Sequence, residues 1–273
     1  MQGRLSPLID NKIQAFPHNN WKNEFQIAQK LGFDLIEWVV DDKNNPIFDN
    51  ECINTILELS EKYEIKINSL CADYFMNNLL FKNTEELIRK NLGFLTHLIQ
   101  QCKKCNIKIL ELPFVDSSSL KNIAEQKQIL ENLETIVNIA QDHDIILCLE
   151  TDLEPNSFVS LLEKFNHPNI KANYDIGNST SKNYDMNIEL DILKKWIVNV
   201  HIKDRIKNGK TVPLGSGDVN FQGFFQNLKK IDYSGDLIIQ GAREDFTNNV
   251  STNQTCLKYL EFVNRYLEKD IAN

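Results

Sequence analysis

The feature that most constrains the fold is a regular alternation of short apolar runs and longer amphipathic runs along the whole chain. The short runs lie between turn-forming residues and predict strands at residues 2–5, 35–40, 66–71, 108–112, 145–150, 171–175, 197–203 and 237–240. The longer runs repeat apolar residues at helical spacing and predict helices at residues 21–31, 53–63, 87–105, 120–140, 158–165, 188–196, 221–231 and 251–267. Strand and helix therefore alternate from one end to the other.

This alternation predicts parallel strands joined by helical crossovers. Eight such units in 273 residues match a closed (β/α)8 TIM barrel, which takes about 250 residues. The alternative is a doubly wound open sheet, but no GxGxxG or phosphate-loop pattern follows an early strand. We therefore predict an α/β protein with one domain, a single (β/α)8 barrel over residues 1–273.

Composition excludes several classes of partner. The net charge of −8 argues against nucleic acid, whose binding usually needs a basic surface. The sequence has no long apolar run and no signal-peptide region, so we expect a cytoplasmic protein without a membrane partner. Cys102 and Cys105 form a CxxC pair without a second pair at zinc spacing, which indicates reduced thiols at a helix end. A homo-oligomer is compatible with all these features.

Polar residues gather where the predicted strands end. In a barrel, the active site lies at the C-terminal ends of the strands. These ends carry Arg4, Glu37 with Trp38, Asp73, Glu111, Glu150, Asp175, His201 with Lys203, and Gln240 with Arg243. One buried acid is often held by a neighbouring base for stability alone, whereas a whole series at the same end indicates a functional site.

Four of these residues come from successive strands and predict a metal site. Glu150, Asp175, His201 and Gln240 offer carboxylate, imidazole and amide donors. Such donors suit one divalent ion, either Mn²⁺, Mg²⁺, Co²⁺ or Zn²⁺. The alternative is a polar barrel mouth held by internal salt bridges, without a metal.

Several motifs of this chain resemble those of the sugar-phosphate isomerase/epimerase family, which has the xylose-isomerase-like barrel. The motifs are MQGRLSP at residues 1–7, LGFDLIEW at 31–38, LE at 149–150, YDIGN at 174–178, HIKDR at 201–205 and PLGSGDV at 213–219. The resemblance implies a divalent metal at Glu150, Asp175, His201 and Gln240, with a sugar or sugar phosphate bound to it through two oxygens. The family usually has Glu at the position of Gln240, often Glu at that of Ser216, and in its epimerases His at that of Asn178.

Gln240 changes the expected chemistry, because an amide cannot accept a proton as a carboxylate does. Sugar isomerases and epimerases remove a proton next to a carbonyl, and a carboxylate within reach accepts it. Glu150 can serve one face of the substrate, whereas inversion of a carbon needs a base on each face. We therefore expect one-base isomerisation rather than two-base epimerisation, with Glu244 as the nearest replacement acid.

Other strand-end residues are candidates for contact with the substrate. Lys203 lies on the same strand face as His201 and either stabilises an oxyanion or pairs with an acid. Arg4, Arg205 and Arg243 suit a phosphate or carboxylate. Trp38 either stacks on a sugar or packs in the barrel. The full set of expected substrate contacts is Arg4, Glu37, Trp38, Asn178, Arg205 and Arg243.

Three other functions use a similar site. A sugar dehydratase or lyase also needs one base and a Lewis acid, and a catalytically reduced sugar-binding barrel would keep the cavity without turnover. A metal-dependent endonuclease shares this type of barrel but needs more His ligands and a basic track. The single strand-end His201 and the negative charge favour the sugar enzyme.

Overall fold

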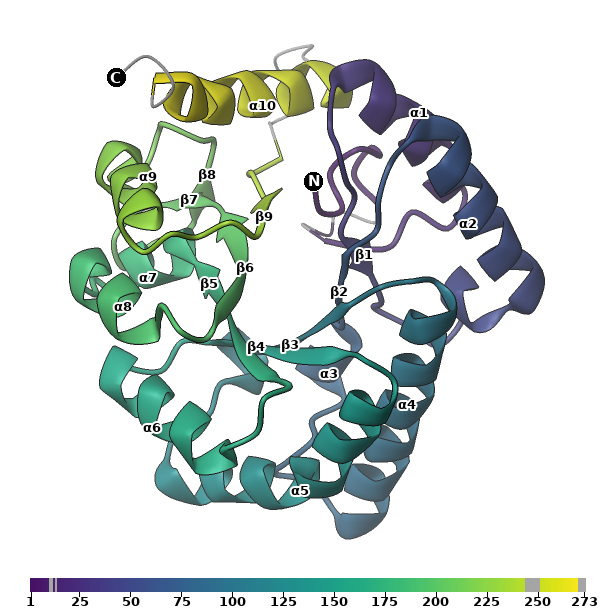
Figure 1. Cartoon of the computed structure of the whole chain (residues 1–273), viewed down its shortest axis with the longest axis vertical. Coiled ribbons are helices and arrows are strands. Elements are labelled where there is room, and N and C mark those ends of the chain that lie inside the picture. The colour runs from purple at the N-terminus through teal and green to yellow at the C-terminus, as the bar shows by residue number, and fades with distance from the viewer. Residues whose placement is uncertain (10–11, 13, 244–250, 270–273) are drawn as a thin grey trace.

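The computed structural model describes residues 1–9, 12, 14–243 and 251–269. Parallel strands form a curled sheet at its centre, and helices surround this sheet (Figure 1). The strands follow the order β1 (Trp38–Val39), β2 (Ser69–Cys71), β3 (Ile109–Phe114), β4 (Ile146–Thr151), β5 (Ile170–Asp175), β6 (Ile197–Ile202) and β9 (Asp236–Ile239). The predicted (β/α)8 barrel is confirmed.

The N-terminal segment closes the barrel between β9 and β1. Gln2 forms a parallel bridge with Glu37, and its backbone amide donates to the carbonyl of Ile239 at 3.2 Å. Gly3 then takes a left-handed φ of 53°, which ends the pairing. The predicted first strand is therefore reduced to a single bridge.

Helices cover the outside of the sheet, as the amphipathic runs predict. The longer ones are α1 (Trp21–Leu31), α2 (Asn50–Tyr63), α4 (Glu85–Lys104), α5 (Ile123–Asp142), α6 (Pro155–Phe165), α8 (Met186–Leu193), α9 (Phe221–Lys230) and α10 (Thr252–Lys269). Among the described residues, no helix combines the length and the apolar character needed to cross a membrane.

Helix α5 shows why these runs become helices. The side chain of Asn122 accepts a hydrogen bond from the backbone amide of Glu125 and so caps the first turn. Ile129, Leu133 and Ile136 follow at helical spacing and are buried against the sheet. The same combination of a capping residue and an apolar stripe recurs in α2, which Asp49 caps.

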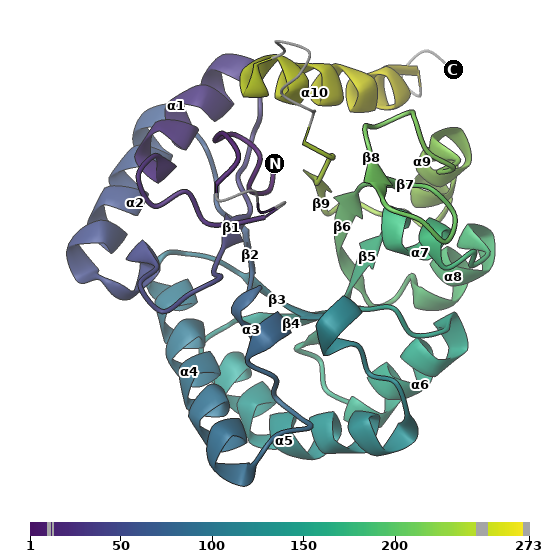
Figure 2. The ribbon, with the colours of Figure 1, turned by 180° about the vertical axis from the view of Figure 1, so that it is seen from behind.

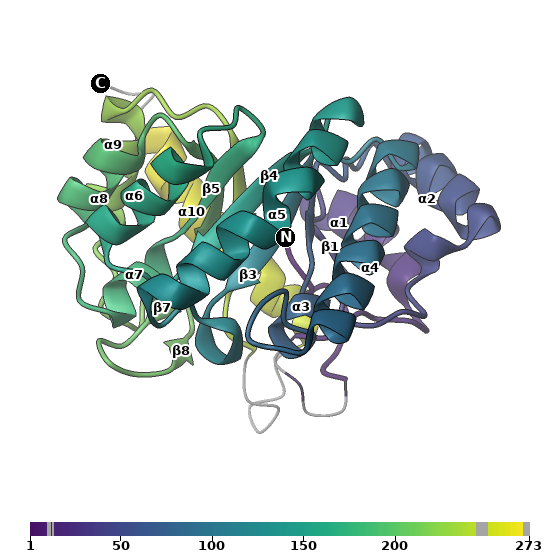
Figure 3. The ribbon, with the colours of Figure 1, turned by 90° about the horizontal axis from the view of Figure 1, so that it is seen from below.

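Short elements surround the C-terminal ends of the strands. They are the 3-10 helices η1 (Pro46–Phe48) and η2 (Asp116–Ser118), the helices α3 (Tyr74–Asn77) and α7 (Ile176–Ser181), and a hairpin of β7 (Asp204–Arg205) and β8 (Thr211–Val212). Helices α3 and α7 and the hairpin lie in front of the sheet in Figure 2 and along its lower side in Figure 3. These elements surround the mouth of the barrel, where the predicted site residues emerge.

Candidate functional site

A network of buried carboxylates lies under His201 in the barrel interior. The Nε2 atom of His201 lies 2.9 Å from Glu37 Oε1 and 3.1 Å from Glu111 Oε2, and all three side chains are fully buried. Glu37 also accepts hydrogen bonds from Ser69 Oγ at 2.6 Å and Asn199 Nδ2 at 2.9 Å. Burial alone would lower the pKa of His201, but Glu111 and Glu37 raise it well above its usual value. These contacts fix the orientation of the imidazole ring.

The other ring nitrogen of His201 faces two of the predicted metal ligands. Its Nδ1 atom lies 3.7 Å from Glu150 Oε2 and 3.9 Å from Asp175 Oδ2. One ligand atom from each of the three residues lies within 4.8 Å of the others, and all three residues are buried. The structure therefore brings together three of the four predicted ligands, from β4, β5 and β6.

The amide of Gln240 is oriented by its hydrogen bonds. The backbone N–H of Gln240 donates to Ile202 O at 2.9 Å, which holds the residue beside β6. Its side-chain Nε2 donates to Gln2 Oε1, and also to Gln14 Oε1 at 3.3 Å. Both amide hydrogens are thus used, while the buried Oε1 atom has no hydrogen-bond partner. This oxygen is the atom that Gln240 has available for a ligand.

These residues fit a divalent metal ion. Buried polar atoms are normally hydrogen-bonded, yet His201 Nδ1 and Gln240 Oε1 have no hydrogen-bond partner. A metal-binding histidine typically donates its second ring N–H to a carboxylate, as His201 does through Nε2. Burial and the neighbouring Glu111 and Asp175 raise the pKa of Glu150 well above its usual value. A cation would offset this concentration of negative charge.

Lys203 supplies one positive charge to the same cluster. Its Nζ atom lies 2.7 Å from Asp175 Oδ2. Burial lowers the pKa of Lys203, but Asp175 and Glu150 more than offset this and raise it. The salt bridge that the sequence left as one of two roles for Lys203 is therefore present, and Lys203 also faces the cavity described next.

A cavity of about 380 Å³ opens above the cluster at the barrel mouth. Its basic lining residues are Arg4, Lys203, Arg205 and Lys210. Glu150, Asp73, Asp116, Gln14, Asn178 and Gln240 also contribute to its lining. A cavity of this size, with charged and amide side chains in its lining, accommodates a small sugar or sugar phosphate.

Asn178 and Arg205 position Glu150 beside this cavity. Asn178 Nδ2 donates to Glu150 Oε1 at 2.5 Å, and Arg205 Nη1 donates to Asn178 Oδ1 at 2.8 Å. Arg205 is itself held by the carbonyl of Gly209, within the β7–β8 hairpin. The three residues form a connected chain from the hairpin to the metal-site carboxylate.

Other residues predicted to contact the substrate lie away from the cavity lining. Glu37 is below His201, and Trp38 is buried against Phe16 and Trp21, with its indole N–H donating to Asn45. Arg243 donates to the carbonyls of Gly3 and Ser6 and so holds the N-terminal segment. These contacts favour packing for Trp38 and an anchoring role for Arg243, whereas Arg4 does line the cavity. Glu244, the acid nearest to Gln240 in the sequence motif, lies outside the described residues.

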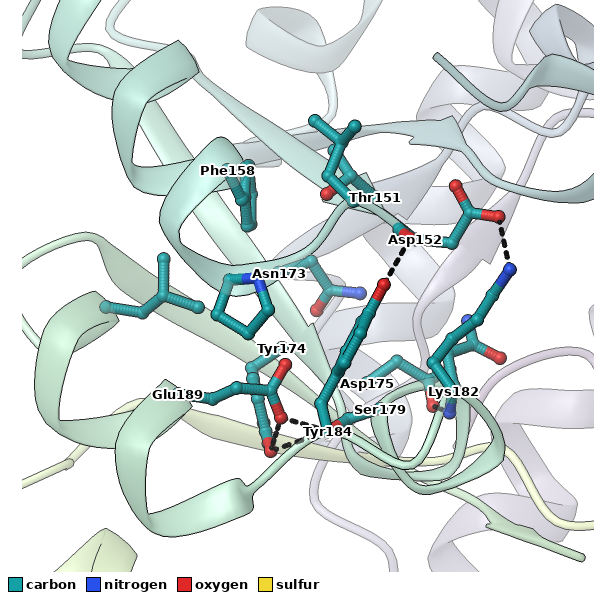
Figure 4. A pocket seen from close by; sticks show the side chains of 14 residues that line it. Thr151, Asp152, Phe158, Asn173, Tyr174, Asp175, Ser179, Lys182, Tyr184 and Glu189 are labelled. Atoms are coloured by element: carbon teal, nitrogen blue, oxygen red, sulfur yellow. Dashed lines mark hydrogen bonds and ion pairs between the residues drawn. The ribbon is translucent and has the colours of Figure 1, made fainter. Parts of the chain in front are cut away.

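A second, smaller pocket lies behind Asp175 (Figure 4). Its volume of about 20 Å³ suffices for roughly one water molecule. Glu189 accepts hydrogen bonds there from Tyr174 Oη at 3.1 Å and from Ser179 Oγ. Burial raises the pKa of Glu189 to about 7, against the opposing hydrogen bonds from Ser179 and Tyr174. This network supports β5 and α7 from the side opposite the cavity.

The fold agrees with a comparison to known families. The family model described as Xylose isomerase-like TIM barrel matches residues 25–258. The chain belongs to this family. The family resemblance seen in the sequence motifs is therefore confirmed.

Curated relatives of this chain are sugar epimerases. It is 27% identical over 236 residues to L-ribulose-5-phosphate 3-epimerase UlaE of Escherichia coli O1:K1, with 81% of each chain covered. The protein of the same name from Shigella flexneri serotype 5b is 26% identical over the same length.

Solved structures share the fold at lower sequence identity. The D-psicose 3-epimerase of Clostridium cellulolyticum H10, solved with D-tagatose, gives a TM-score of 0.76 at 16% identity and covers 94% of this chain and 96% of its own. The IOLI protein, solved with a zinc atom, gives 0.74 at 18% identity and covers 91% and 94%. These similarities show that the chain shares the barrel fold of both proteins.

Proposed function

We propose that this protein is a metal-dependent isomerase or epimerase that acts on a sugar or sugar phosphate. The convergence of Glu150, Asp175 and His201 Nδ1 beneath the cavity is the observation that carries the proposal. Gln240 Oε1 completes the proposed set of ligands. The basic residues around the cavity and the name of the curated relatives favour a phosphorylated substrate.

Glu150 is the proposed proton-transfer residue. Asn178 engages its Oε1 atom, while Oε2 lies on the side of His201 Nδ1. A bound divalent ion would polarise the substrate carbonyl and stabilise the negative charge of an enediolate. Glu150 would then remove the proton from the neighbouring carbon. Lys203 would place positive charge beside the oxygen that becomes negative.

The predicted metal ligands favour proton transfer on a single face of the substrate. Asp175 is engaged by Lys203, and Gln240 cannot accept a proton in the way a carboxylate does. Glu150 alone would move a proton between adjacent carbons, as in interconversion of a ketose and an aldose. A dehydratase or lyase step would use the same base and the same ion.

Exchange of solvent deuterium tests this function without assuming the final product. The metal-loaded protein is incubated in D₂O with L-ribulose 5-phosphate and with unphosphorylated ketoses, and the recovered sugars are analysed by mass spectrometry. We expect metal-dependent deuterium incorporation next to the carbonyl, reduced about 10²–10⁴-fold in Glu150→Gln, because general-base catalysis contributes about that much.

Glu163→Gln is the matched control, because the Glu163 side chain is 59% exposed on α6. Undiminished exchange in Glu150→Gln would contradict the proton-transfer role. A metal-loaded wild type that binds these sugars without exchange at any carbon would instead favour the sugar-binding barrel.

A further inference from the structure

The cavity contains a carboxyl group that the proposed chemistry has not used. Asp73 lies two residues beyond the end of β2 and lines the cavity together with Glu150 and Gln240. In the order of strands around the closed barrel, β2 lies opposite β6, which carries His201. Asp73 therefore reaches the mouth across from His201, while Glu150 lies two strands along from it, on β4.

Asp73 is linked to Gln240 through one intervening residue. Gln14 Nε2 donates to Asp73 Oδ2 at 2.5 Å, while Gln14 Oε1 accepts from Gln240 Nε2 at 3.3 Å. The carboxyl thus lies two hydrogen bonds from the amide that stands where the family has a carboxylate. Arg4 Nη1 donates to the same Gln14 oxygen at 3.3 Å, which fixes the orientation of this bridge.

The surroundings of Asp73 suit proton transfer rather than a salt bridge. Among the described residues, no Lys, Arg or His nitrogen lies within 4.0 Å of its carboxylate. Its other oxygen accepts from the Cys71 thiol at 3.2 Å. Burial raises the pKa of Asp73 to about 6, against the opposing hydrogen bond from Cys71. A carboxyl with this pKa donates and accepts protons near neutral pH.

We propose that Asp73 is the second proton-transfer residue, so that the cavity presents one carboxyl to each face of the substrate and inverts a carbon next to the carbonyl of a ketose phosphate. This proposal rests on the proposed function. It assigns to β2 the base that the family motif places on the last strand, and it replaces one-base isomerisation with two-base epimerisation.

The proton and electron changes balance over one inversion. The Glu150 carboxylate takes the proton from the carbon next to the carbonyl, and the C–H electron pair forms the enediolate double bond as the carbonyl π pair moves to oxygen. Protonated Asp73 then donates to the opposite face, so that its O–H bond breaks, a new C–H bond forms and the carbonyl returns. Glu150 finally releases its proton to water, and Asp73 takes one up.

The test separates the two half-reactions in Asp73→Asn. The metal-loaded variant is incubated with L-ribulose 5-phosphate in D₂O, and both inversion and deuterium in the recovered substrate are followed. We expect inversion to fall by about 10²-fold or more, the usual contribution of an acid–base group. Exchange at the same carbon should persist, since Glu150 still removes the proton. Asp144→Asn is the matched control, because Asp144 is 70% exposed and pairs only with Lys103 among the described residues.

Two further measurements guard against a purely structural effect. Metal content and the melting temperature of Asp73→Asn should match those of the wild type, and Asp73→Glu, which keeps a carboxyl group, should restore part of the inversion. Inversion by Asp73→Asn at the wild-type rate would overturn the proposal. So would a wild type that exchanges deuterium without inversion, and in that case the proposed function would stand. A wild type that shows neither exchange nor inversion would overturn both the Asp73 proposal and the proposed function.

Discussion

Two groups of polar side chains at the base of the cavity differ in how they carry charge. We call Glu150, Asp175, His201 and Lys203 the acidic side, and Gln2, Gln14 and Gln240 the amide side. On the acidic side, ionisable groups lie within 4 Å of one another, as in the Lys203–Asp175 and His201–Asp175 contacts. On the amide side, neutral groups are joined by hydrogen bonds alone.

This difference shows that the residues around Gln240 suit an amide. Its Nε2 group needs acceptors, and the side-chain oxygens of Gln2 and Gln14 supply them. Gln14 is held in turn by Asp73, which accepts from its amide nitrogen. A carboxylate at position 240 would face the side-chain oxygens of Gln2 and Gln14, which cannot donate a hydrogen bond to it. The negative charge expected from the family motif is therefore absent here, and Asp73 provides a carboxyl at the far end of the same chain of hydrogen bonds.

The largest expected effect comes from removing the imidazole of the acidic side. His201→Ala leaves Glu37 and Glu111 buried without their shared partner. Breaking a buried ion pair by removing one member costs about 3–5 kcal/mol. We also expect the variant to lose any stabilisation by Mn²⁺, which for the wild type should reach about 2.7 kcal/mol at a metal concentration of 100 times Kd. Urea unfolding with and without metal measures both terms.

Gln240→Ala is the corresponding change on the amide side. It removes one neutral ligand and no charge, so metal should still stabilise this variant, though less than the wild type. Equal loss of metal stabilisation in the two variants would mean that the two sides contribute alike. Stabilisation that persists in His201→Ala would show that the ion binds elsewhere.

The strand–helix pattern of the sequence is sufficient to predict the barrel but not the side-chain contacts at its mouth. Strand–helix alternation predicts the fold because each parallel strand is buried by the helix that follows it. The hairpin of β7 and β8 was missed, because two-residue strands leave no periodic signal. Asp73 was recognised as a strand-end acid, yet its link to Gln240 runs through a loop residue, Gln14, and no local pattern reveals such distant partners.

The roles predicted for Glu37 and Trp38 illustrate the same limit. Both follow from position near a strand end, and this position does not tell which way a side chain turns. Glu37 lies below His201 because the imidazole and Asn199 supply donors there. Trp38 packs with Phe16 and Trp21 because the apolar face of α1 lies over it. Only the long-range contacts of the folded chain decide such orientations.

A smaller effect concerns the buried carboxyl behind the acidic side. Burial raises the pKa of Glu189 to about 7 from an ordinary value of 4.5. Between these values the folded protein keeps a proton that the unfolded chain has lost, so stability falls as pH rises through this window. Glu189→Gln stays neutral and still accepts a hydrogen bond from Tyr174. As pH rises from 5 to 8, the free energy of unfolding of Glu189→Gln should therefore increase by about 1–3 kcal/mol relative to that of the wild type.

Chemical denaturation across this pH range measures the difference, with Glu163→Gln as the exposed control. A constant difference between Glu189→Gln and wild type from pH 5 to pH 8 would mean that Glu189 does not retain its proton in the folded protein. The support behind Asp175 would then be ionic, like the rest of the acidic side.

The smallest expected effect tests whether charge can be moved back to the amide side. Gln240→Glu adds a negative ligand, and we expect Mn²⁺ to bind about tenfold more tightly, since an anionic oxygen is the stronger donor for a hard divalent ion. The gain is limited because the new carboxylate meets the acceptor oxygens of Gln2 and Gln14. Gln2 can turn to present its Nε2 atom, which is buried without a partner.

Gln14 can present its Nε2 atom to the new carboxylate only by turning its Oε1 atom toward Asp73. Protonated Asp73 can donate a hydrogen bond to that oxygen, so the variant should favour protonated Asp73. Metal competition titrations together with the pH dependence of inversion therefore report on both ends of this chain. Tighter metal binding with an unchanged pH profile would show that Asp73 and Gln240 are not coupled through Gln14.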